Sequence, residues 1–159
     1  MTFELARTAN PMNFQPIFWA GLIAGTLDIT AAFLTAWLRA GVTPARVLQF
    51  VASGLLGAAS FSSGTKTMLL GLALHFLIAT VAATVFYFAS RKLLVLIERP
   101  VLLGLLYGVV VYAFMNFVVL PLSRVQSRPM TVTGFSIGLL TIMFCIGLPI
   151  AFIVRRFSR

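Results

Sequence analysis

The chain has 159 residues, of which 60% are hydrophobic and 9% are charged, and its mean hydropathy is +1.05, so it has too few polar side chains to cover a soluble domain. The formal net charge of +9 does not indicate a nucleic-acid-binding protein, because the basic residues stand at the ends of apolar runs rather than along a polar surface. We therefore expect an all-α integral membrane protein that contacts the lipid bilayer and no nucleic acid.

Residues 1–15 form a short tail, because two prolines near its end prevent a helix from continuing upstream. The first transmembrane helix is expected over 16–38. Its Trp19 and Trp37 are about 27 Å apart at 1.5 Å per residue, which is close to the separation of the two interfacial belts. The apolar run is too long for the core of a signal peptide and has no small-residue cleavage site, so we expect this helix to be retained.

The segment 46–61 is short, and its apolar part is diluted by Ser53, Gly54, Gly57 and Ser60. Apolar runs of this length are more often interfacial or re-entrant than spanning. A polar, small edge beside an apolar face is also typical of a helix that lies along a membrane surface. We expect a short interfacial or re-entrant helix here and keep a fifth span as the alternative.

Three further apolar runs predict transmembrane helices over 67–90, 101–122 and 133–154, followed by a basic tail at 155–159. The segment 16–154 is thus expected to form a single bundle of four transmembrane helices plus the short helix. With four spans, the side that holds both termini has 7 Lys and Arg residues against 5 opposite; with five, the side of the C-terminus has 8 against 4. The positive-inside rule mildly favours five spans, and both counts place the C-terminus in the cytoplasm.

Small residues form a face on each predicted span. Three spans carry a Gly-xxx-Gly pair, and the span over 67–90 carries a similar stripe. Helices in lipid approach closely through such faces, because lipid removes the hydrophobic drive between them. The faces either form the inside of one compact monomer or include an interface to a second copy or a larger membrane complex. The candidate helix-packing residues are Gly21, Gly25, Gly71, Gly104, Gly108, Gly134 and Gly138.

Asp28 is the only acidic residue within a predicted span, and His75 is the only histidine in the chain. Asp28 is expected within about 2 Å of the middle of its helix, whereas His75 and Asn116 lie about 5 Å and about 7 Å toward the non-cytoplasmic side. Asp28 and His75 also lie on the small faces of their helices, while Asn116 is about 100° away from the Gly104 face. These three residues form a candidate intramembrane polar site.

An ionised carboxylate near the bilayer centre is costly unless it is paired or hydrated, so we expect Asp28 to be protonated, hydrated or partnered. A direct hydrogen bond to His75 is the obvious solution. The pair would then either fix the register of two helices or form a proton- or ligand-handling site in which Asp28 changes its protonation.

Residues typical of catalytic and cofactor sites are scarce. With one histidine and one cysteine, the chain cannot complete a zinc, di-iron or bis-histidine haem site. It also has neither a nucleophile-elbow nor a phosphate-binding glycine motif. We expect no catalytic residue, no metal and no cofactor.

Several short motifs resemble the YagU-like group of small bacterial inner-membrane proteins. They are GLIAG at 21–25, GLLYG at 104–108 followed by Pro-Leu at 121–122, and His75 with the aromatic run that ends YFASR at 87–91. The resemblance implies a bacterial inner membrane and supplies no activity.

We therefore predict a non-enzymatic, multi-pass inner-membrane protein that acts as a structural or accessory component of a membrane assembly. The alternative is a small oligomeric proton-coupled transporter in which Asp28 is the switchable acid. A third interpretation, the handling of a lipid or hydrophobic ligand, rests on Arg124 and Arg128 beside a helix end.

Overall fold

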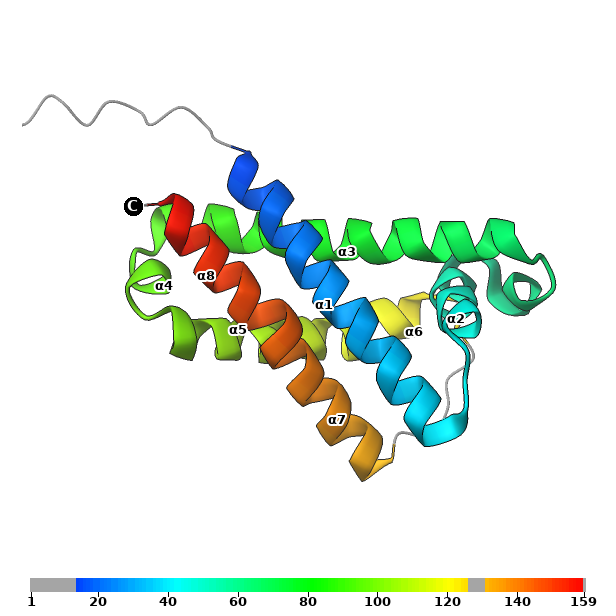
Figure 1. The fold of residues 1–159 in the computed structure, drawn as a ribbon. Coiled ribbons are helices and arrows are strands. Elements are labelled where there is room, and N and C mark those ends of the chain that lie inside the picture. The colour runs from blue at the N-terminus through cyan, green and yellow to red at the C-terminus, as the bar shows by residue number, and fades with distance from the viewer. Residues whose placement is uncertain (1–13, 126–130, 159) are drawn as a thin grey trace, which may run out of the picture.

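The computed structural model describes residues 14–125 and 131–158, which form helices joined by short turns, with no strand among them (Figure 1). Residues 1–13 of the tail expected over 1–15 lie outside the described residues, as do Arg128 and Arg159, and Gln15 already belongs to the first helix. Four described helices are long and apolar enough to cross a membrane, which confirms the prediction of a helical fold with four helices of spanning length. They are α1 (Gln15–Ala40), α3 (Thr65–Lys92), α5–η2–α6 (Pro100–Leu122) and α7–η3–α8 (Val132–Phe157).

Each long helix begins one or two residues earlier than expected and ends up to three residues later. The added residues at the ends include basic side chains, such as Arg39 in the last turn of α1 and Arg155 in that of α8. Cations favour the C-terminal end of a helix because the helix dipole places partial negative charge there. A prediction that ends each helix with its apolar run therefore makes the helix too short.

The bundle has two layers. α1 and α7–η3–α8 lie side by side and run in opposite directions, and they cross over α3 and α5–η2–α6, which form the second layer (Figure 1). α1 packs on α3, whereas α5 packs on η3 and α8. The start of α1, the short α4 (Val95–Glu98) and the end of α8 lie toward one end of the bundle, and α2 and α6 lie toward the other.

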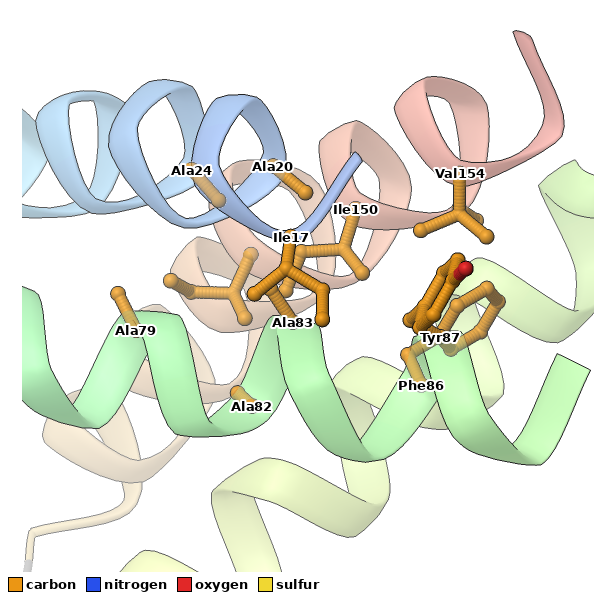
Figure 2. Close-up of a cluster of buried hydrophobic side chains, with 12 residues drawn as sticks. Ile17, Ala20, Ala24, Ala79, Ala82, Ala83, Phe86, Tyr87, Ile150 and Val154 are labelled. Atoms are coloured by element: carbon orange, nitrogen blue, oxygen red, sulfur yellow. The ribbon is translucent and has the colours of Figure 1, made fainter. Parts of the chain in front are cut away.

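Alanines allow the two layers to approach closely. Ala20 and Ala24 of α1 lie opposite Ala79 and Ala83 of α3, and all four are almost fully buried (Figure 2). Larger buried side chains fill the core beside them; these include Phe86, Tyr87, Ile150 and Val154. Helices that associate in lipid have no hydrophobic drive toward one another, and close van der Waals contact of this kind is what stabilises their association.

α1 ends in a tight turn that leads directly into the next helix. Gly41 has a left-handed φ of 61°, and its N–H donates to carbonyls in the last turn of α1. Thr43 then caps the following helix, because its hydroxyl accepts a hydrogen bond from the N–H of Arg46, and Pro44 occupies the first turn, where no N–H is needed. The connection between the two helices thus takes only three residues, 41–43.

The helix expected over 46–61 comprises α2 (Pro44–Leu56) and the 3-10 segment η1 (Gly57–Phe61). α2 has 13 residues, or about 20 Å at 1.5 Å per residue, against about 30 Å of hydrocarbon in a bilayer. It packs on α3 at Gly71, where an added Cβ atom would collide with the Leu48 carbonyl. α2 is not among the helices of spanning length, so the described chain has four such helices and not five.

Two of the long helices contain a π-helical segment just before a proline. η2 (Met115–Val119) ends two residues before Pro121, and η3 (Met143–Gly147) ends two residues before Pro149. After each segment, a leucine N–H donates to the methionine carbonyl five residues earlier. Proline lacks an N–H and its ring crowds the carbonyl four residues earlier, so a wider turn lets each helix continue.

We predict that Gly108→Ala lowers the free energy of unfolding by about 1–3 kcal/mol, the usual effect of overpacking. The added Cβ atom would lie 2.5 Å from the Met143 Cα, so backbone must move. The measurement is an SDS titration of the folded protein in mixed micelles, followed by tryptophan fluorescence.

Gly54→Ala is the matched control, because its Cβ atom would lie 3.8 Å from Ser123 Cβ, an ordinary contact. The helix propensity of alanine should make this variant as stable as the natural chain or slightly more so. Equal stability of the two variants would contradict the proposed α5–η3 contact.

Candidate functional site

The first component of the site is the close approach of α1 to α3. A Cβ atom on Gly25 would lie 2.9 Å from the Phe76 ring, and one on Gly21 would lie 2.8 Å from the Thr80 hydroxyl. A side chain at either position would therefore force Phe76 or Thr80 of α3 to shift. Because glycine has no side chain, the α1 backbone is also open toward α3 at these two positions. A side chain of α3 can therefore reach a main-chain carbonyl of α1.

His75 makes that contact. Its Nε2 atom lies 2.8 Å from the carbonyl oxygen of Gly25, so the ring joins α3 to α1. A backbone carbonyl only accepts hydrogen bonds, so the bond requires the proton to be on Nε2. In a neutral ring, Nδ1 is then left as an acceptor.

Asp28 lies one turn further along α1 and is half-buried. The expected direct hydrogen bond between Asp28 and His75 is not formed, and within the described chain the Asp28 carboxylate accepts no hydrogen bond. The carboxylate nevertheless interacts electrostatically with His75 and with Cys145 of η3. Asp28 therefore lies where three helical segments, α1, α3 and η3, come together.

Cys145 is not among the site residues predicted from the sequence. The signal for it was Pro149, four residues later, because this proline cannot donate the N–H that the Cys145 carbonyl would accept in a regular helix. The resulting π segment η3 packs on α1, and the Asp28 carboxylate contributes to the electrostatic environment of the Cys145 thiol. π segments of this kind occur often at functional sites.

Asn116 has a separate environment. Its Nδ2 atom donates to the Tyr112 carbonyl at 2.8 Å, one turn earlier in the same helix. No hydrogen bond in the described chain links it to Asp28 or His75. The candidate site thus consists of Asp28 and His75, with Cys145 on the neighbouring η3. Asn116 lies in η2, outside this site.

The remaining candidate glycines lie at other contacts. Gly104 and Gly108 pack against η3 and α8, and Gly147, which sequence reasoning missed, meets them from the other side. Gly138 lies 3.1 Å, measured from an added Cβ atom, from the Tyr112 ring. Gly134 lies beside its own Thr131 cap, and no other described helix comes within 4 Å of its added Cβ atom.

The acidic, thiol and imidazole groups of the described chain do not form a metal site. No group of three or more His, Cys, Asp or Glu side chains is close enough to hold a metal ion among the described residues. Asp28, His75 and Cys145 together do not meet this condition. The chemistry of the site is therefore that of a half-buried acid in the neighbourhood of an imidazole.

Comparisons of the chain with protein-family models, curated proteins and solved structures found no match. The likeness to the YagU-like group remains a prediction from short motifs.

We predict that His75→Phe lowers the free energy of unfolding by about 0.6–1.5 kcal/mol, the range for a hydrogen bond between transmembrane helices. Phenylalanine keeps an aromatic ring beside Phe76, whose centroid lies 5.6 Å from that of His75, but it cannot donate to Gly25. The free energy is measured by SDS titration in mixed micelles.

The matched control is Thr84→Val, which removes a hydroxyl from the same helix. That hydroxyl donates to the Thr80 carbonyl of α3 itself at 2.8 Å and joins no second helix. A loss of stability in Thr84→Val as large as in His75→Phe would show that the contact between α1 and α3 is not what the histidine provides.

Proposed function

We propose that the protein is a small proton-coupled transporter in which Asp28 is the switchable acid. The observation that carries the proposal is the position of Asp28, a half-buried carboxylate in the middle of an apolar helix that receives no hydrogen bond within the described chain. A carboxylate kept only to fix helix register would be expected to have a hydrogen-bond donor. Without one, the free energies of its charged and neutral forms depend strongly on water and on neighbouring charge.

The surroundings of Asp28 support the same proposal. His75 is held by the Gly25 carbonyl and is therefore fixed within electrostatic range of the acid. Nδ1, the ring atom that does not contact Gly25, remains available for a hydrogen bond. η3, which carries Cys145, is a π segment packed on α1, and π segments of this kind are frequent at functional sites.

The position of the helix ends supports a membrane topology. The basic residues of the described chain lie at or beyond the ends of the long helices, and none lies within the middle of one. We propose a multi-pass protein of a bacterial inner membrane, with the C-terminus in the cytoplasm.

We predict that infrared titration of the protein in lipid nanodiscs detects a carboxylic-acid band that disappears as pH rises, because Asp28 loses its proton. The band should be absent from Asp28→Asn and retained in Asp28→Glu. Glu98→Gln is the matched control, because Glu98 is the other described carboxylate and lies outside the long helices in α4.

Proteoliposomes that contain a pH-sensitive dye test the transport step. Under an imposed membrane potential, we expect proton flux from the natural chain and from Glu98→Gln, and a flux equal to that of protein-free liposomes from Asp28→Asn. An Asp28 band that does not titrate, together with a large loss of stability in Asp28→Asn, would assign the residue a structural role instead.

A second candidate function, an accessory component of a membrane assembly, is favoured by the third long helix. In α5–η2–α6 only 17% of the most apolar stretch is buried, the lowest share of the four. The glycine faces that would dock a partner are largely occupied by contacts within the chain, as at Gly25 and Gly108. A partner would therefore have to cover other surface.

For this second function, we predict that extraction in lipid particles without detergent yields a foreign chain at fixed stoichiometry by native mass spectrometry. A preparation that contains copies of this chain alone would exclude a stable accessory role.

A further inference from the structure

An apolar groove separates α3 from α5 and η2 on the side of α3 away from α1. It consists of two neighbouring cavities of about 380 and 500 Å³. Ile78, Phe114, Met115 and Val119 line both cavities, so the two form one continuous groove. Each volume lies within the range of about 300–1,000 Å³ that is typical of small-molecule sites.

The wall of the groove has few polar groups that could form a hydrogen bond with an occupant. Tyr107 lines the first cavity, but its hydroxyl donates to the Ala82 carbonyl at 2.6 Å. Its ring also packs edge-on against Phe86, with the ring centroids 5.0 Å apart. The remaining wall of the first cavity consists of aliphatic, phenylalanine and methionine side chains, so an occupant of this part must be apolar.

The groove is poorly suited to a second helix. Helices that associate in lipid usually meet through glycine, alanine or serine, which let their backbones come close. Most of the lining instead consists of large side chains, with Ala82, Gly54 and Ser123 as the small exceptions. Branched side chains such as Ile78 and Val81 keep a partner backbone at a distance, whereas a flexible acyl chain can fill the spaces between them.

The groove ends beside a cation. Ser123 and Val125 line the second cavity, and Arg124 between them is exposed. The backbone N–H of Arg124 donates to the carbonyl of Gly54, another lining residue, at 2.9 Å. This hydrogen bond holds the backbone of Arg124 to α2 at the end of the groove. The guanidinium itself forms no hydrogen bond within the described chain.

Among the described residues, this end of the bundle has basic side chains and no acidic ones. Arg46 and Lys66 lie at the starts of α2 and α3. The side-chain carboxylates of the described chain are Asp28, inside α1, and Glu98, in α4 toward the opposite end. An anionic group placed here would meet positive charge without repulsion from a carboxylate.

We propose that this groove binds a phospholipid with an anionic headgroup, with one acyl chain in the groove and the phosphate beside Arg124. From Tyr107 to Ser123 the groove follows sixteen residue steps, or about 24 Å of helix, which exceeds the half-thickness of about 15 Å of a bilayer core. An acyl chain that descends from a headgroup at Arg124 therefore fits along it. The proposal is independent of the function of Asp28, which lies on the other side of α3.

The test is native mass spectrometry of the full chain after reconstitution in vesicles with equal amounts of phosphatidylglycerol and phosphatidylcholine. We expect one retained phospholipid per chain, with phosphatidylglycerol favoured about fivefold through its contact with Arg124. Val119→Trp, which narrows the point where the cavities meet, should abolish retention, and Val110→Trp at the exposed rim should reduce it. Arg124→Gln should leave retention intact and remove the preference.

Two matched variants separate the groove from general effects. Leu106→Trp places the same large side chain on an exposed position of α5 that lines neither cavity, and Lys92→Gln removes a cation at the opposite end. Both should retain phosphatidylglycerol like the natural chain. Equal retention of the two lipids by the natural chain, equal loss in Leu106→Trp, or a second protein chain in place of the lipid would overturn the proposal.

Discussion

The structure depends on the close approach of α1 to α3 at Gly21 and Gly25. In lipid, two apolar helices gain little from contact unless their backbones come near enough for extensive van der Waals packing. The missing side chains at these glycines provide that approach, and the buried alanines beside them extend it. The same approach exposes the Gly25 carbonyl to His75, so one packing feature both stabilises the layers and fixes the imidazole.

The two π segments are a second local feature on which the packing of the bundle depends. In each of the two long helices that contain a π segment, a proline follows the segment. The helix accommodates this proline by widening one turn instead of breaking. At η3 this widening coincides with Gly147, whose lack of a side chain lets α5 come into contact at Gly104. The segment that approaches Asp28 is therefore held from its other side by a glycine contact with α5.

Much of the fold followed from sequence, because length, hydropathy and basic ends are local properties. The four long helices, the short helix at α2 and the importance of small faces could be predicted from runs and spacing alone. The detailed contacts could not. Depth and helical face place Asp28 and His75 near one another, yet they do not specify the side-chain rotamers and the axial offset of α1 against α3, which decide that the ring contacts a backbone carbonyl and not the carboxylate.

The same limit explains the other differences. A proline within an apolar run predicts a disturbance, but not whether the helix kinks, ends or widens, so the position of Cys145 could not be derived. Gly134 and Gly138 have the spacing of a docking motif, but Gly134 lies in the first turn beside its own cap, where no other described helix approaches. The spacing of small residues identifies which helix faces can pack closely. Which of these faces do so depends on how the turns place the helices relative to one another.

α3 shows how one helix can serve two different neighbours. The face that meets α1 and α2 carries Gly71, Ala79 and Ala83, whereas the face along the groove carries Ile78, Val81 and Val85. In water both faces would be equally driven to bury themselves, but in lipid only the small face gains from another helix. In lipid, the branched face therefore gains little from packing on α5, and a groove is left between the two helices. The absence of a hydrophobic drive between helices in lipid thus explains both this groove and the close contact of α1 with α3 through small residues.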